Sequence, residues 1–250
     1  MFPYKKGEFQ IIKKEDLDKC KDRDGKHYFK CGIYRAQIKD SHILFHNNPL
    51  NYYTHIDLQN AYKLGLEIKL IDDDTPNFLY YHSSKCINST TLFGNYVDYL
   101  YELKKSHPDI KYIKRILNIL WGALSEIKYT NKYMLNDDSD VILEENEKIL
   151  NYRKYSDNEY LVECREIGNL YQSGFARIAP FLTARGRNMI SDLAIKHVKD
   201  LNNIYRIHTD SIITTEKLDI KLKEDCNLGD FGLEKKGKCN IINKRDVEWN

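Results

Sequence analysis

Two consecutive stretches of helical periodicity, residues 93–105 and 109–126, constrain the fold of this 250-residue chain most strongly. Apolar side chains recur every three or four residues in both stretches, which is the spacing of one helix face. The residues expected to face inward are Phe93, Val97, Leu100 and Leu103 or Tyr101 in the first helix, and Ile113, Ile116, Leu117 and Leu120 in the second. The sequence therefore predicts two long helices in succession near the middle of the chain.

The segments before these helices have mixed character. Residues 1–55 have the composition of short strands and turns, and a strand is expected over residues 27–34, after an Asp-Gly turn signal. A short helix is expected over residues 57–66, with Thr54 or Asp57 as its cap. The N-terminal part of the chain should therefore be rich in strands and end in a helix.

The rest of the chain also contains both strands and helices. The sequence predicts a strand over residues 68–71, strands within 140–180, a helix over about 180–200 and a hairpin over 204–215. The candidate core residues of that helix are Leu182, Met189, Leu193, Ile195 and Val198. Helices and strands that are segregated along the chain in this way predict an α+β fold.

Composition excludes several classes of protein. The formal net charge is only +2, so no strong basic field indicates nucleic acid. The six cysteines lie far apart without a CxxC pair, which argues against a zinc ribbon or a redox motif. No apolar run approaches the about 20 residues that span a bilayer. We therefore expect a soluble, intracellular protein without a membrane partner.

The second long helix carries a polar face. Lys111, Lys114 and Asn118 are spaced i, i+3, i+7, so two ammonium groups and an amide share one side. Such a face suits a triphosphate, because the ammonium groups neutralise its oxygens. Gly122, near the helix end, would let a base pair or a backbone approach closely. The alternative is an ordinary amphipathic helix with a lysine-rich solvent side, which physical chemistry alone favours.

The same helix resembles the Kx3NSxYG motif of the fingers of family B DNA polymerases, with Ile119 and Trp121 at the serine and tyrosine positions. In that family the lysine contacts the phosphates of the incoming nucleotide, and the asparagine and tyrosine lie near the nascent base pair. The resemblance passes these roles to Lys114, Asn118 and Trp121. The residues expected to bind the nucleotide are thus Lys111, Lys114, Asn118, Trp121 and Gly122.

A second motif lies within the predicted hairpin. Residues 205–212 resemble the family's YxDTDS motif, a hairpin whose tip holds a metal-binding carboxylate. Asp210 corresponds to the essential second aspartate, and the resemblance makes it the catalytic ligand of Mg²⁺ or Mn²⁺. His208 replaces the first aspartate, and a neutral imidazole is a poor Mg²⁺ ligand. The alternative is a plain polar turn that contains an aspartate.

Further segments follow in the family's order. Residues 177–187 resemble the helix start before the aspartate hairpin, and residues 228–234 resemble the segment after it. Lys244 falls in the position of the KxY primer-strand motif, where Asp246 replaces the tyrosine. The resemblance covers roughly residues 50–245. The residues it implies as DNA contacts are Arg185, Arg187 and Lys244.

Polymerisation with two metals requires a second carboxylate. In the family it comes from motif A, DxxSLYP, and the candidate here is Asp57, with Tyr62 at the motif's spacing. A competing interpretation, which we prefer, makes Asp57 a helix cap, because residues 53–59 resemble a segment between motif A and the fingers of protein-primed members. Motif A would then lie upstream, since residues 2–7 resemble the sequence just beyond it.

The resemblance implies an α+β fold with a family B palm, an antiparallel sheet with helices, and a helical-hairpin fingers subdomain. The expected divisions are a strand-rich segment 1–55, a fingers region 56–130 and a palm region 131–250. The implied function is that of a DNA-directed DNA polymerase fragment or subunit, which transfers dNMP from a dNTP to a primer 3′ end on a primer–template. A second chain carrying motif A and the exonuclease domain would complete it. The alternative is a catalytically inactive relative that binds DNA or protein as an accessory or structural protein.

Overall fold

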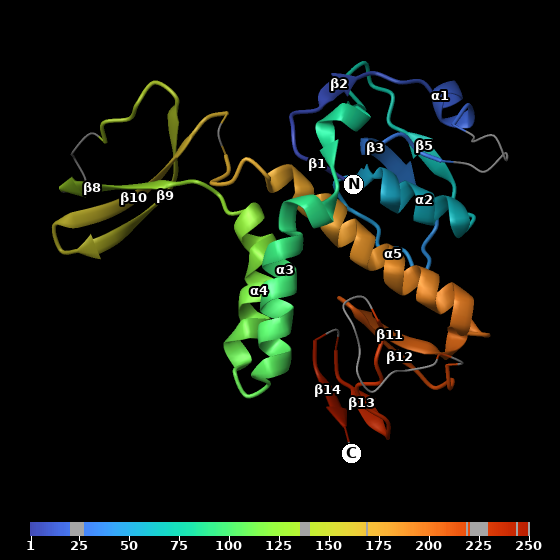
Figure 1. Ribbon diagram of the computed structural model, residues 1–250. Coiled ribbons are helices and arrows are strands. Elements are labelled where there is room, and N and C mark those ends of the chain that lie inside the picture. The colour runs from blue at the N-terminus through green and yellow to red at the C-terminus, as the bar shows by residue number, and fades with distance from the viewer. Residues whose placement is uncertain are drawn as a thin grey trace. The chain divides into compact units, whose positions relative to one another are not determined.

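The computed structural model of the chain describes residues 1–20, 28–135, 141–168, 170–218, 220, 230–243 and 245–249 (Figure 1). These residues form a mixed α+β structure with several small antiparallel sheets and five α-helices, so the predicted α+β class is confirmed. Contacts divide the chain into two units. Unit 1 comprises Met1–Lys6 and His82–Leu182, and unit 2 comprises Gly7–Tyr81 and Thr183–Asn250. Within the described residues, no helix is long and apolar enough to cross a membrane.

Unit 2 is built on an antiparallel sheet with the strand order β2-β6-β3-β4, in which β5 also pairs with β3. Its elements are β2 (Glu8–Gln10), α1 (Lys14–Asp18), β3 (Gly32–Ile38), β4 (Tyr52–Thr54), β5 (Ile68–Leu70) and β6 (Phe78–Tyr80). The predicted strand over 27–34 has the wrong bounds, because β3 begins only at Gly32. Before it, the Tyr28 amide donates to the carbonyl of Cys20 (2.9 Å), a local contact outside the sheet.

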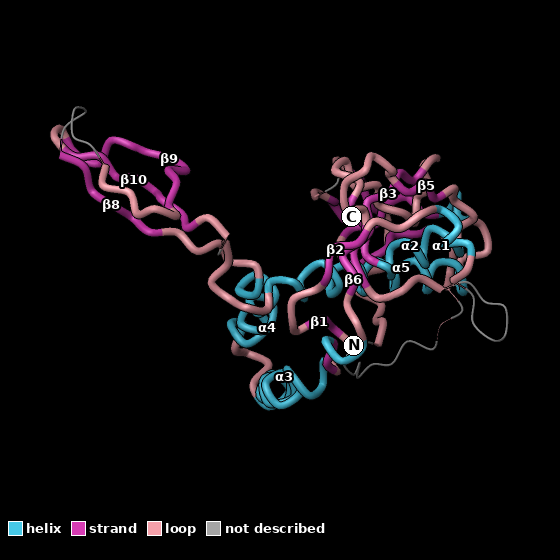
Figure 2. The backbone as a smooth tube through the Cα atoms, turned by 90° about the horizontal axis from the view of Figure 1, so that it is seen from above, coloured by secondary structure: helices cyan, strands magenta, loops and turns pink. Residues whose placement is uncertain are grey.

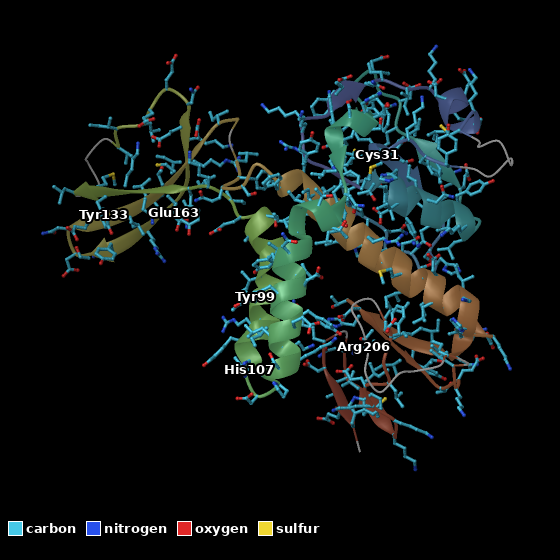
Figure 3. The ribbon with its side chains drawn as sticks, in the orientation of Figure 1. Cys31, Tyr99, His107, Tyr133, Glu163 and Arg206 are labelled. Atoms are coloured by element: carbon cyan, nitrogen blue, oxygen red, sulfur yellow. The ribbon has the colours of Figure 1, made fainter. Side chains whose placement is uncertain are left out.

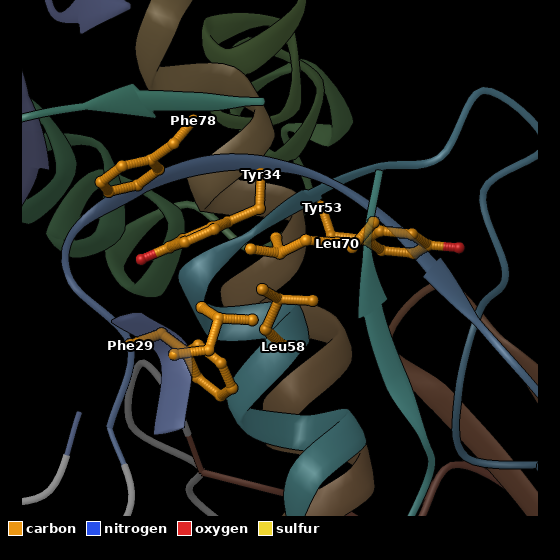
Figure 4. Packing of buried hydrophobic residues seen from close by; sticks show 8 residues of the cluster. Phe29, Tyr34, Tyr53, Leu58, Leu70 and Phe78 are labelled. Atoms are coloured by element: carbon orange, nitrogen blue, oxygen red, sulfur yellow. The ribbon is translucent and has the colours of Figure 1, made fainter. Parts of the chain in front are cut away.

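The apolar core of unit 2 lies between this sheet and α2 (His55–Lys63), as Figure 4 shows. The rings of Tyr34 and Phe78 stack with centroids 4.2 Å apart, and Leu58 of α2 is fully buried in the same cluster. Burying an apolar side chain of this size stabilises a fold by about 1.5–3 kcal/mol. This cluster therefore fixes α2 against the sheet.

The helix α2 ends earlier than the predicted residue 66, and Gly65 explains why. Gly65 has a φ of 73°, a conformation that residues with a Cβ rarely adopt. Its amide donates to the carbonyl of Tyr62 (3.1 Å), and the Leu66 amide donates to that of Ala61 (3.0 Å). This pair of hydrogen bonds is a Schellman motif, which stops a helix by satisfying its last carbonyls.

The helix α5 (Ala179–His197) meets α2 through polar side chains. Ser191 Oγ donates to Asn60 Oδ1 (2.8 Å), and both residues are buried. Two ion pairs join the same helices, and we call the whole set the polar seam. Its pairs are Asp57–Arg187, Asn60–Ser191 and Lys63–Asp192.

The predicted core of α5 is partly wrong. Leu193 and Val198 are buried, whereas Leu182 and Ile195 are 37% and 47% exposed. The buried positions of this helix include small and polar residues such as Ser191, which hydropathy does not identify. At its C-terminal end, small and branched residues pack with the hairpin that follows. This cluster contains Leu44, Ala194, Val198 and Ile204, with Ile207 and Ile212 packed against it.

Unit 1 contains a helical hairpin and a three-stranded sheet (Figure 2). Its elements are β1 (Phe2–Pro3), η1 (Ser83–Lys85), β7 (Cys86–Ile87), α3 (Ser89–Ser106), α4 (Lys111–Leu124), β8 (Thr130–Leu135), β9 (Glu147–Ser156), β10 (Glu159–Glu166) and η2 (Ala176–Ile178). The two predicted long helices are confirmed. In α4, however, Ile113 and Leu124 are buried, whereas Ile116 is 42% exposed. The inward face of α4 runs from Ile113 to Leu124, and Ile116 lies outside it.

The three-stranded sheet of unit 1 has the strand order β8-β10-β9. The small sheets of unit 2 are two-stranded hairpins. Strands predicted within 140–180 are present as β9 and β10. The last hairpin joins β13 (Cys239–Ile241) to β14 (Val247–Trp249). None of the five cysteines in the described part of the chain forms a disulfide with another of them.

Candidate functional site

The predicted metal ligand Asp210 lies at the tip of a hairpin formed by β11 (Ile204–His208) and β12 (Ser211–Thr214). His208 pairs with Ser211, so the loop consists of Thr209 and Asp210. Thr209 has a φ of 54°, which is unusual for a β-branched residue. The hairpin predicted over 204–215 is thus confirmed, with the Asp210 side chain exposed at its tip.

The turn itself makes no use of the Asp210 carboxylate. Ser211 Oγ donates to the carbonyl of His208 (3.0 Å), and Thr209 Oγ1 lies 3.3 Å from His208 Nδ1. Asp210 has no hydrogen bond or ion pair with any residue that the structure describes. Its carboxylate is therefore open to a cation or another ligand.

The base of the hairpin is held by a carboxylate at its far end. Glu216 accepts hydrogen bonds from the amide of Lys199 (2.9 Å) and from Asn203 Nδ2 (3.3 Å). The Lys199 amide and then the Asn203 side chain hold the pKa of Glu216 below its ordinary value. On β11, Arg206 Nη2 donates to the carbonyl of Arg245 (3.1 Å). These contacts fix the two strands that carry the tip.

Asp57, the other candidate carboxylate, is engaged within the fold. Thr54 is the N-cap of α2, and Asp57 Oδ2 accepts from the Thr54 amide (3.0 Å) and hydroxyl (2.8 Å) in a capping box. Asp57 Oδ1 accepts from Arg187 Nη2 (2.8 Å) and Nε (3.2 Å). Four hydrogen bonds thus occupy a carboxylate whose side chain is only 11% exposed. Asp57 therefore takes part in the cap of α2 as its third residue, while the N-cap itself is Thr54.

The predicted DNA contacts differ in their surroundings. The Arg187 guanidinium is held by Asp57, which gives it a structural contact in the polar seam. Arg185 is exposed, and it makes no hydrogen bond or ion pair with a residue in the described ranges. Lys244 lies outside the described residues. Asp246 accepts from Asn243 Nδ2 (2.7 Å) in the turn between β13 and β14.

The structure does not assemble a metal site from the predicted ligands. No group of three or more His, Cys, Asp or Glu side chains that could hold a metal ion is found among the described residues. His208 and Asp210 are both exposed at the hairpin tip, whereas Asp57 is occupied in α2. A metal at Asp210 would therefore need a further carboxylate that these residues do not supply.

The nucleotide-binding residues predicted in α4 all belong to one helix of unit 1. Asn118 and Gly122 are exposed. The backbone of α4 is described throughout, while the side-chain positions of Lys111, Lys114 and Trp121 lie outside the described part of the structure. These residues lie in unit 1, whereas the hairpin with Asp210 lies in unit 2.

The structure of α4 does not require a glycine at position 122. A Cβ at this position would meet no atom within 4 Å, and glycine inside a helix costs about 1 kcal/mol relative to alanine. Neither packing nor a positive φ explains its presence. A glycine that costs stability without a packing role favours a close approach by something outside the helix.

Some polar residues that shape unit 2 were not found from the sequence. Asn60 and Ser191 are buried partners, and Arg206 connects β11 to Arg245. Such contacts join residues that are far apart in the chain, so local patterns carry no signal for them.

No protein-family model, curated protein or solved structure matches this chain.

Proposed function

We propose that this chain is a fragment or subunit of a family B DNA polymerase of the protein-primed kind. The observation that carries the proposal is the position of Asp210. Its carboxylate is exposed on a two-residue hairpin tip and makes no hydrogen bond or ion pair with a described residue. This placement suits a ligand of Mg²⁺ or Mn²⁺ bridging to the triphosphate of a dNTP.

The fingers helix supports the same function. Asn118 is exposed in α4, on the side of the helix where the spacing also places Lys111 and Lys114. A Cβ at Gly122 would meet no atom within 4 Å, so there is room for a base pair on that side of the helix. In this proposal the lysines neutralise the triphosphate, and the asparagine and glycine lie next to the nascent pair on the primer–template.

The engagement of Asp57 shapes the proposal. Metal ions in such a site lie about 3.5–4 Å apart and are bridged by two carboxylates. Because Asp57 holds Thr54 and Arg187, it cannot bind metal without losing both. The second carboxylate therefore comes from outside the described residues, and we propose a second chain that carries motif A.

A second candidate function follows from the same residues. His208 stands where the family has its first aspartate, and no three-ligand metal cluster is present among the described residues. Both observations favour a catalytically inactive relative that binds DNA or a protein partner. Such a protein would bind DNA with a steep salt dependence and would not need Asp210.

Metal-dependent nucleotide binding separates the two functions. We would measure binding of a fluorescent dNTP to the full chain with Mg²⁺, with Mn²⁺ and with chelator, followed by primer extension. Asp210→Asn should abolish the metal-dependent part of binding. The matched control is Asp157→Asn, because Asp157 also lies in a two-residue hairpin turn, between β9 and β10.

The outcomes are distinct. Loss of metal-dependent binding in Asp210→Asn but not in Asp157→Asn supports the polymerase function. Extension that appears only after a motif A-bearing chain is added would identify the missing carboxylate. Equal nucleotide binding by both variants, or none by the parent chain, would refute the proposal and leave the inactive relative as the better description.

A further inference from the structure

The three-stranded sheet of unit 1 exposes aromatic rings on a surface outside the proposed polymerase site. Tyr133 of β8 and Tyr155 of β9 are 65% and 64% exposed. Their ring centroids lie 5.6 Å apart with an interplanar angle of 75°. Large exposed aromatic side chains that gather at one place commonly mark a binding surface. Figure 3 labels Tyr133 together with Glu163 of the central strand.

These rings lie over the middle strand β10. Leu161 pairs with Tyr133 on one side and with Arg153 on the other, so the three side chains share one face of the sheet. Leu161 is only 5% exposed, although it belongs to the central strand of a thin sheet. We call this surface the tyrosine face. It consists of Tyr133, Arg153, Tyr155 and Leu161.

The tyrosine face offers stacking surfaces and one free cation. The edge-to-face arrangement leaves most of the ring faces of Tyr133 and Tyr155 uncovered by each other. Arg153 is exposed and makes no hydrogen bond or ion pair within the described ranges. An unpaired guanidinium beside open aromatic rings matches the chemistry of a nucleobase with its attached phosphate.

One edge of this sheet, the strand β9, is protected against further strands. The register between β9 and β10 shifts twice, between Glu159 and Tyr160 and between Glu163 and Cys164. Such bulges bend an edge strand away from additional strands. Lys148 and Lys154 are further charged residues on the edge strand β9. Strand addition from a second polypeptide is therefore disfavoured at β9.

We propose that the tyrosine face binds single-stranded nucleic acid by stacking unpaired bases on Tyr133 and Tyr155, with Arg153 contacting one phosphate. A duplex does not fit this chemistry, because its bases are already stacked on each other. Two carboxylates, Glu159 and Glu163, flank Leu161 on β10, so the face is not strongly basic. Stacking should then dominate the affinity, and the salt dependence should be shallow, about one counterion per bound strand.

This inference does not rest on the proposed polymerase function, because none of its residues belongs to the polymerase motifs. The test is fluorescence anisotropy of the full chain with a labelled strand of about 15 thymidines, the equivalent uridine strand and a duplex of the same length. Each Tyr→Ala change at 133 or 155 should weaken single-strand binding about 5- to 100-fold. The Phe variants, which keep the rings, should bind nearly as well as the parent chain.

Tyr99→Ala is the matched control, since Tyr99 is 68% exposed on α3 of the same unit. It should leave binding unchanged, and so should Asp210→Asn, which separates this inference from the polymerase site. Preference for the thymidine or the uridine strand would identify DNA or RNA as the ligand, and equal binding would show that the base alone is read. Binding that survives the double alanine variant, that requires Arg185 instead, or that is absent for both single strands would overturn the proposal.

Discussion

The ion pair between Asp57 and Arg187 should be worth more than a surface salt bridge, because one partner is almost buried. The Asp57 side chain is 11% exposed and that of Arg187 is 39% exposed. Arg187→Ala would leave the carboxylate with only its two hydrogen bonds from Thr54. Breaking a fully buried pair costs about 3–5 kcal/mol, whereas exposed pairs contribute about 0–1 kcal/mol. For this half-exposed pair we expect a loss of about 2 kcal/mol.

Asp57→Ala should cost a similar amount for a different reason. It removes the capping-box acceptor, worth about 1 kcal/mol, and releases Arg187, which can turn to solvent. Because both single variants lose the same interaction, the double variant should cost less than their sum. We expect a coupling energy of about 1–2 kcal/mol between the two positions.

Urea denaturation of the four proteins, followed by circular dichroism, measures this coupling. Hydrogen exchange of the α2 amides would confirm that the loss is local to unit 2. Arg185→Ala is the control, because Arg185 lies on the same helix, is exposed and has no partner within the described residues. It should change the free energy of unfolding by less than about 0.5 kcal/mol. Effects of Asp57→Ala and Arg187→Ala that add within about 0.3 kcal/mol would refute the reasoning.

Three further variants test other features. Thr209→Gly should stabilise unit 2 by about 0.5–1 kcal/mol in urea denaturation, because it relieves the φ of 54° at the hairpin tip; a destabilised variant would contradict this. Gly122→Ala should raise the free energy of unfolding by about 0.5–1 kcal/mol yet weaken dNTP binding, and unchanged binding would count against a close approach at α4. Burial lowers the pKa of His55, so the folded state favours its neutral form. Its contribution to stability should be present above about pH 6.5, its unfolded pKa, and decline as the pH falls below that value; His55→Gln should lack this part of the pH profile, and identical profiles would exclude it.

Helices were predictable because their signal is local. The spacing of apolar residues predicted α3 and α4 to within a few residues of their bounds. The end of α2 was misplaced because the helix stops before Gly65, which has a positive φ. The inward face of α4 was less predictable, since Ile116 has the hydropathy of a core residue but lies exposed. Burial depends on which neighbours pack against a helix, and that information is not local.

The residues of the candidate site also divide into those that the sequence predicts and those that depend on distant contacts. The strand pattern predicted a hairpin over 204–215, the resemblance to the YxDTDS motif placed Asp210 at its tip, and the structure has Asp210 there. The engagement of Asp57 was predictable in part, because Thr54 three residues before it forms a capping pattern, but its bond to Arg187 joins residues 130 positions apart. The exposed rings of Tyr133 and Tyr155 were also not singled out, since tyrosines in strands usually pack inward.

The polar seam has a consequence for how this sequence can diverge. A buried hydrogen-bonding group that loses its partner costs about 1–3 kcal/mol, so Asn60 and Ser191 cannot change freely one at a time. The same holds for Asp57 with Arg187. Distant descendants of this chain should replace these residues in matched pairs. The two paired positions should stay three residues apart on α2 and four residues apart on α5, even after the surface motifs have changed. Correlated substitution at these four positions is thus a way to recognise relatives that share no readable catalytic motif.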